Sequence, residues 1–60
     1  MNVKALRKQR GLNQTILAKK VGVTQAYIAM LEKGAKVNPT LALLTKLAKA
    51  LKVPVAELLR

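Results

Sequence analysis

Two glutamines, Gln14 and Gln25, lie eleven residues apart in this sequence, and each carries a side-chain amide. A primary amide carries a hydrogen-bond donor and an acceptor side by side, and adenine presents the complementary pair, N7 and N6, in the major groove of DNA. Both glutamines could instead be solvated surface residues without a shared role. The choice between these interpretations depends on the elements that position them.

The remaining side chains exclude most other chemistry. The 60-residue chain has no cysteine and no histidine, and its only acidic side chains are Glu32 and Glu57. General acid–base catalysis and metal ligation both need such groups at matched positions. We therefore expect neither an enzyme nor a metal site, and no cofactor or small-molecule ligand.

The charge of the chain is strongly one-sided. Twelve Lys and Arg against two Glu give a net charge of +10. The positive side chains repel one another in the folded state, and together they attract polyanions. Nucleic acid is the first candidate, an anionic membrane surface is the second, and a merely solubilising surface is the simplest alternative. No apolar run approaches the ~20 residues that span a bilayer, and the N-terminus lacks the apolar stretch of a signal peptide. A cytoplasmic protein that does not bind membranes is expected.

Apolar residues recur at intervals of three and four, which predicts helices and no strand. Asn13, Thr24 and Thr40 are suited to begin helices as N-caps, and Gly22 and Gly34 are suited to end them. One all-α domain spanning residues 1–60 is expected, with helical segments at about 2–9, 14–21, 25–33, 41–51 and 55–60. Each segment is too short to be stable alone, so the segments must pack on one another.

The corner between the second and third segments is the feature that could project a helix. Gly22 permits a positive φ, which a sharp interhelical turn often needs. The residues expected to close a small core beneath the corner are Leu17, Val21, Ile28 and Leu31. Ile16 is expected to join the stripe of the second segment, and Leu41 begins the stripe of the fourth, followed by Leu44, Leu47, Ala48 and Leu51. The outer face of the third segment then projects from a basic scaffold and fits the DNA major groove, which is about 12 Å wide.

These residues resemble the helix-turn-helix domains of the Cro and phage-repressor type, the XRE family. The resemblance covers about residues 6–59 and is carried by Gln14, Leu17-Ala18, Gly22-Val23, Ile28, Glu32, Gly34, Asn38-Pro39 and the run LAKAL. It implies a compact five-helix, lambda-repressor-like fold with the helix-turn-helix in helices two and three. It also implies a bacterial or phage transcriptional regulator that binds double-stranded DNA at a palindromic operator, associates with the nucleoid when bound, and reads the major groove with residues 24–33.

The resemblance also implies roles for individual residues. The expected base contacts are Gln25, Ala26, Ala29 and Met30, of which the last three could contact thymine methyl groups, form a dimer or partner surface, or simply favour the helix. The expected contacts to the DNA backbone are Gln14, Thr24, Tyr27, Lys33, Lys36, Asn38, Thr40 and Arg10. Tyr27 could instead pack on the scaffold or stack on a base, and Arg10 could be a solvated charge. In resembling repressors the earlier glutamine touches a phosphate and steadies the later one, which reads adenine.

Two further expectations concern structure and assembly. Glu32 lies at the end of a helix, where a carboxylate is unfavourable for the helix dipole, and the resemblance pairs it with Arg7. We expect a partly buried pair with several hydrogen bonds that holds the first segment to the third, and the alternative is an exposed pair that contributes about 0–1 kcal/mol. A weak homodimer through Val55, Leu58 and Leu59 is expected, although these residues could instead seal the core of the monomer. The family often has glycine where this chain has Lys52.

Alternatives to DNA recognition remain at this point. An antitoxin-like or other protein-interaction module could use the same fold. A cationic amphipathic chain acting on membranes is the third possibility, but such a chain does not need Gly22, Gly34 and capped turns.

Overall fold

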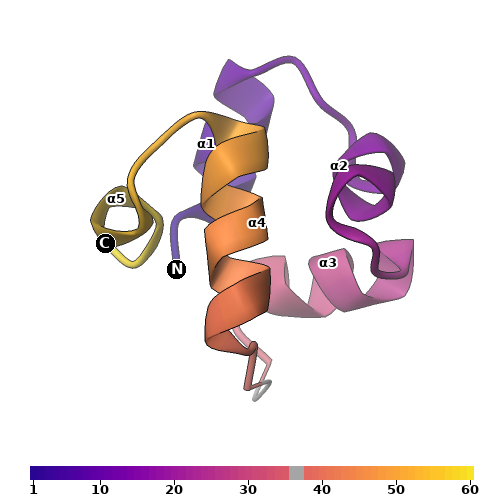
Figure 1. The fold of residues 1–60 in the computed structure, drawn as a ribbon. Coiled ribbons are helices and arrows are strands. Elements are labelled where there is room, and N and C mark those ends of the chain that lie inside the picture. The colour runs from indigo at the N-terminus through magenta and orange to yellow at the C-terminus, as the bar shows by residue number, and fades with distance from the viewer. Residues whose placement is uncertain (36–37) are drawn as a thin grey trace.

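Five helices make up the fold in the computed structural model, which describes residues 1–35 and 38–60. They are α1 (Val3–Gln9), α2 (Gln14–Val21), α3 (Gln25–Lys33), α4 (Leu41–Leu51) and α5 (Val55–Leu58) (Figure 1). No strand occurs in these two ranges, so the predicted all-α class is confirmed. The structure begins the first helix one residue later than expected, and the last helix ends at Leu58 rather than at Arg60.

Three polar side chains begin the central helices, as the sequence predicts. Asn13, Thr24 and Thr40 each have an extended backbone and accept a hydrogen bond from a backbone N–H three residues later. The three donors are the N–H groups of Ile16, Tyr27 and Leu43, at 2.7, 3.1 and 3.0 Å. Each bond satisfies a donor that the first turn of a helix leaves without an intrahelical partner.

Left-handed backbone conformations end the same three helices. Gly22 (φ 77°) follows α2, Gly34 (φ 78°) follows α3, and Lys52 (φ 59°) follows α4. Glycine adopts this conformation at little cost, whereas a residue with a Cβ is disfavoured there. Lys52 is the one non-glycine residue with a positive φ in the described part of the chain.

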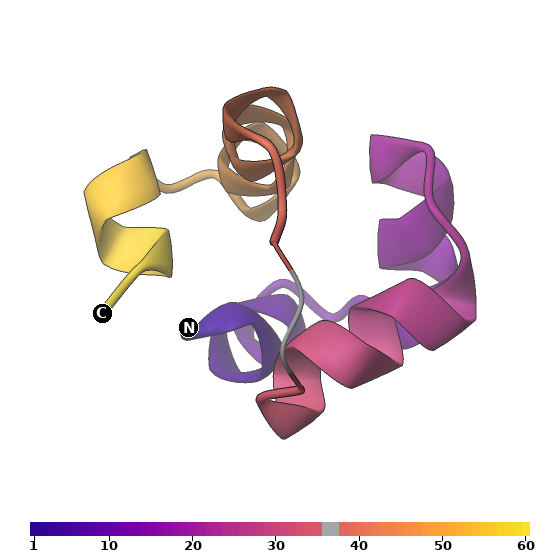
Figure 2. The same cartoon turned by 90° about the horizontal axis from the view of Figure 1, so that it is seen from below.

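One hydrophobic core holds the helices together. Its fully buried side chains are Val3, Leu17, Ile28, Leu47, Leu51 and Leu58, contributed by all five helices. Helix α2 packs on α3 and α4, α1 packs on α3, and α5 packs on α4. The backbone N–H of Asn2 donates to the carbonyl of Leu58 at 2.9 Å, which brings the two ends of the chain together (Figure 2).

Two large aliphatic residues that were expected in the buried stripes, Ile16 and Leu41, are exposed in the structure. Ile16 is 42% exposed, because the buried face of α2 consists of Leu17, Ala18 and Val21 and Ile16 lies on its flank. Leu41 is 74% exposed, because it is the first residue of α4 and the buried residues of that helix begin at Leu47. A helical period identifies a face, but it does not show how far along the helix that face is covered.

Candidate nucleic-acid interface

Helix α3 is held by one face and presents the other outward. Ile28 and Leu31 are buried against the core, while Gln25, Ala26 and Met30 are exposed. Figure 2 shows α3 along one edge of the molecule, joined to α2 by the tight corner at Gly22. The turn at Gly22 therefore leaves the outer face of α3 exposed, as the sequence predicts.

A chain of hydrogen bonds runs from α1 to the outer face of α3. Arg7 Nε and Nη2 donate to Glu32 at 2.7 and 3.1 Å. Gln14 Nε2 donates to Glu32 Oε1 at 3.0 Å, and Gln25 Nε2 donates to Gln14 Oε1 at 2.6 Å. The Arg7–Glu32 end of this series of hydrogen bonds is buried, since the two side chains are only 9% and 3% exposed. The outer end, Gln25, is exposed to solvent.

The charges at the inner end stabilise each other. Burial by itself raises the pKa of Glu32, but hydrogen bonds from Arg7 and Gln14, with the positive charges of Arg7 and Lys4, outweigh burial and lower it. The hydrogen bonds to Glu32 raise the pKa of Arg7, partly opposed by desolvation. Arg7 Nη1 also donates to the carbonyl of Leu12 at 2.8 Å. Glu32 is therefore an ionised carboxylate that accepts two hydrogen bonds from Arg7 and one from Gln14.

The four residues expected to contact bases all lie on α3. Gln25 and Ala26 stand exposed in its first turn, Met30 is 42% exposed, and Ala29 is half-buried. The outward surface thus consists of one amide at the start of the helix followed by small or flexible apolar side chains. An amide can read a base edge, and apolar side chains can contact thymine methyl groups.

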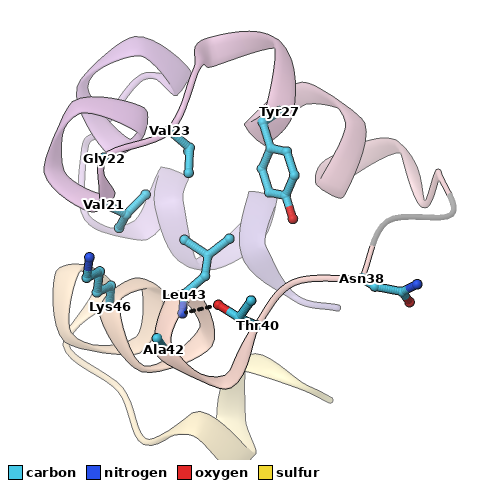
Figure 3. A pocket seen from close by; sticks show the side chains of 9 residues that line it. All are labelled: Val21, Gly22, Val23, Tyr27, Asn38, Thr40, Ala42, Leu43 and Lys46. Carbon is cyan, nitrogen blue, oxygen red and sulfur yellow. Dashed lines mark hydrogen bonds between the residues drawn. The ribbon is translucent and has the colours of Figure 1, made fainter.

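A shallow pocket of about 330 Å³ lies between the helix-turn-helix corner and the start of α4 (Figure 3). Tyr27 extends from α3 toward the segment that leads into α4, and Thr40 lies on that segment. Asn38 also borders the pocket, although its side-chain amide points away from Tyr27 in Figure 3. Lys46 adds a positive charge to the same pocket. The polar groups of this lining suit an anionic oxygen, because hydroxyl and amide donors and the N-terminal end of α4 favour negative charge. The rest of the lining is apolar and includes Val21, Val23 and Leu43.

The other expected backbone contacts are distributed around this surface. Gln14 and Thr24 lie in or next to the first turns of α2 and α3, and Lys33 is exposed at the end of α3. Lys36 lies outside the described residues. Arg10 lies elsewhere: its Nε donates to the carbonyl of Leu51 at 2.9 Å and its Nη2 to that of Lys52 at 3.3 Å. Arg10 is thus accounted for as a cap on the C-terminal end of α4.

The residues expected at a dimer interface divide between the core and the surface. Leu58 has no exposed area and packs in the core of the monomer, so a second copy could not touch it without unfolding α5. Leu59 is 52% exposed, and Val55 is half-buried.

The link between Gln14 and Glu32 is the feature that sequence reasoning missed. The ion pair and the glutamine pair were expected as two separate units, whereas the structure joins them through one amide. The expected pair of Glu32 with Arg7 was the available signal, because one arginine does not occupy every acceptor position of a carboxylate.

This fold and site define a helix-turn-helix domain of the Cro and phage-repressor class. The family model described as helix-turn-helix matches residues 3–58. The chain belongs to this XRE-type helix-turn-helix family.

Individual relatives are transcriptional regulators. The chain is 35% identical over 57 residues to the HTH-type transcriptional regulator SinR of Bacillus subtilis, covering 95% of this chain and 51% of SinR. An uncharacterised HTH-type transcriptional regulator of Archaeoglobus fulgidus is 41% identical over 56 residues, covering 93% of this chain and 79% of that protein. The crystal structure of SinR, the master regulator for biofilm formation, in complex with DNA superposes with a TM-score of 0.87 at 34% identity, covering 97% of this chain and 92% of that chain.

The chain spans about half the length of SinR. In the described ranges, no helix has the length and apolar character needed to cross a membrane.

Proposed function

We propose that this chain is a sequence-specific DNA-binding domain that regulates transcription, with α3 in the major groove. The observation that carries the proposal is the placement of Gln25: an amide on the exposed start of the projecting helix, held in one position by Gln14. Fixing this side chain before binding matters, because a glutamine loses up to ~2 kcal/mol of rotamer entropy when it is immobilised. The likeness to SinR, solved in complex with DNA, supports the same function.

Affinity in this proposal comes from contacts to the DNA backbone. Gln14, Thr24 and Lys33 flank α3, and the pocket residues Tyr27, Asn38 and Thr40 would receive phosphate on the other side. Such contacts fix the position of the domain, and base contacts by Gln25, Ala26, Ala29 and Met30 would supply the choice of sequence. The net charge of +10 increases the rate of encounter with DNA.

The proposal includes a weak homodimer and a palindromic operator. The exposed Leu59 and the half-buried Val55 are the apolar residues of α5 that a second copy could cover. Half-sites about 34 Å apart would then place two copies of α3 in successive major grooves. Binding to DNA also implies a cytoplasmic location.

A salt titration on duplex DNA tests the backbone contacts. Log affinity should fall linearly with log salt, by about 0.9 for each phosphate neutralised, giving a slope near 5 for about six contacts per dimer. A flat response across the titration would contradict binding through phosphates. The double variant Lys8→Gln and Lys19→Gln is a control for bulk charge, because both lysines are exposed on α1 and α2 and are not among the proposed contacts.

A further inference from the structure

Glu32 stands at the centre of the series of hydrogen bonds, between Arg7 on one side and Gln14 on the other. We infer that this carboxylate determines which end of the Gln25 amide faces DNA, and therefore sets the preference for adenine over guanine at the base pair that Gln25 reads. Glu32 is in this sense a positioning residue that acts through Gln14. The inference rests on the proposed function, because it concerns how the same base is chosen.

At the buried end of this series of hydrogen bonds, the donor is always Arg7 and the acceptor is always Glu32. An arginine side chain only donates hydrogen bonds, and an ionised carboxylate only accepts them. Glu32 accepts from Arg7 at 2.7 and 3.1 Å and from Gln14 at 3.0 Å. Neither group can reverse its role, so the direction of every bond farther along the chain follows from this pair.

The donor and acceptor roles of Arg7 and Glu32 also fix the orientation of the Gln14 amide. Since Glu32 requires a donor, the NH₂ group of Gln14 must face inward, which leaves its Oε1 as the group that meets Gln25. An amide rotated by 180° would place two acceptors, Oε1 of Gln14 and Oε1 of Glu32, against each other. Gln14 therefore offers Gln25 an acceptor only, and Gln25 has to respond with a donor, as the 2.6 Å bond from its Nε2 shows.

The orientation of Gln14 decides which groups of the exposed Gln25 amide remain free to meet a base. With one N–H of Gln25 directed to Gln14, the amide has its Oε1 and a second N–H left to meet a base. Adenine matches this pair, because N6 donates to an oxygen and N7 accepts from an N–H. Guanine does not match, because its O6 and N7 are both acceptors and O6 would oppose Oε1. A glutamine whose amide can rotate could turn its NH₂ group to guanine, so the tether is what favours adenine.

The test compares two variants that damage the same ion pair in different ways. Glu32→Gln replaces the obligatory acceptor by an amide that can donate or accept, so Gln14 and Gln25 can both rotate. Arg7→Lys also removes hydrogen bonds of the pair, but it keeps the carboxylate at position 32 and so keeps the polarity. Each protein is titrated onto a selected duplex and onto the same duplex with the adenine changed to guanine, at a temperature where it is folded. The base pair is the one whose preference Gln25→Ala abolishes.

The expected readout is the ratio of the two affinities. Glu32→Gln should reduce the adenine-to-guanine ratio by about 10-fold, which is within the discrimination that one bidentate contact provides. Arg7→Lys should leave the adenine-to-guanine ratio unchanged, even if it lowers the melting temperature as much as Glu32→Gln does. Equal losses of the ratio in both variants would overturn the inference, because the pair would then act only by holding the helices together.

A second variant keeps the test valid if Glu32→Gln does not fold. Gln14→Met interrupts the chain between Glu32 and Gln25 without touching the ion pair, and it should reduce the ratio to the same extent. Thr15→Met is the matched control, because Thr15 is the exposed neighbour of Gln14 in the same turn, and it should leave the ratio intact. A Gln14→Met protein that keeps the parent's ratio would overturn the inference. A parent protein that binds no duplex would instead overturn the proposed function.

Discussion

Glu32 is both nearly buried and ionised, and a glutamate is almost never fully buried unless it is paired. Its pKa is lowered in the folded protein, so the unfolded state binds more protons as the pH falls below the ordinary value of 4.5. Stability from this group is therefore complete above that pH and is lost as the pH falls toward the lowered pKa.

We predict that the melting temperature of the parent protein decreases as the pH is lowered from 5 to about 2, and that Glu32→Gln largely removes this decrease. At neutral pH, Glu32→Gln should lower the free energy of unfolding by about 3–5 kcal/mol, since it leaves Arg7 without its counter-charge. Thermal melts followed by circular dichroism measure both effects. Glu57→Gln is the control, because Glu57 forms only an exposed pair with Arg60 and should leave the acid response intact. A Glu32→Gln protein that melts within a degree or two of the parent would contradict the prediction.

The two glutamines should act as a unit in DNA binding. Gln25→Ala is expected to relax the preference at one base pair per half-site and to weaken binding to the best operator by about 1–3 kcal/mol. Gln14→Ala should weaken binding to all sequences and reduce the same preference, because it removes the acceptor that holds Gln25. A double-mutant cycle measured by DNA titration should give a coupling energy different from zero. Strictly additive losses, with the base preference intact in Gln25→Ala, would exclude a joint role.

Part of this site could be anticipated from the sequence. Glu32 at a helix end, and two amides at the starts of neighbouring helices, are local features, and the family resemblance suggested their partners. The contact between Gln14 and Glu32 was not accessible in this way, because it joins residues 18 positions apart through the relative placement of α2 and α3. Helical periodicity specifies which residues share a face, but it does not specify which polar groups of two crossing helices meet. The contacts of Arg10 with the end of α4 have the same origin, since its acceptors lie 41 and 42 residues away.

Among the elements, the ends of the helices carry the clearest testable difference. Gly22 and Lys52 have the same left-handed conformation, with φ of 77° and 59°, but only Gly22 is suited to it. We predict that Gly22→Ala destabilises the protein by about 1–2 kcal/mol through backbone strain alone, because an added Cβ would meet nothing within 4 Å. Lys52→Gly should have the opposite effect and stabilise by up to about 1 kcal/mol. Urea unfolding curves measure both, and a loss of stability in Lys52→Gly would show that the lysine side chain matters more than its backbone.

The helices themselves were largely predictable because caps and stops are local. Asn13, Thr24 and Thr40 form the expected caps, and each cap depends only on a side chain and the N–H three residues later. The exposure of Ile16 and Leu41 was not predictable, because it depends on which elements cover the two helices. The all-α class followed from the periodicity, whereas the arrangement of the helices required the structure or the family.

For the molecule as a whole, assembly is the property with the most direct experimental test. Leu59 is a half-exposed apolar residue next to α5, and a second copy would remove it from water. We predict that the parent protein forms a weak dimer at high concentration and that Leu59→Glu abolishes it without altering the melting temperature. Leu41→Glu is the matched control, since it adds the same charge at a leucine that is 74% exposed on α4. Sedimentation of the parent as a strict monomer, with and without DNA, would contradict the dimer.

The central claim is that α3 reads sequence and that the basic surface does not simply bind any polyanion. The measurement that tests it most directly is the ratio of affinities, at one salt concentration, for a duplex selected from random sequence and for a scrambled duplex of equal length and composition. A sequence-reading domain should bind the selected duplex about 10³-fold more tightly or better, and Gln25→Ala should reduce that ratio. Equal affinity for the two duplexes would contradict the claim and would leave a folded polycation that binds DNA by charge alone.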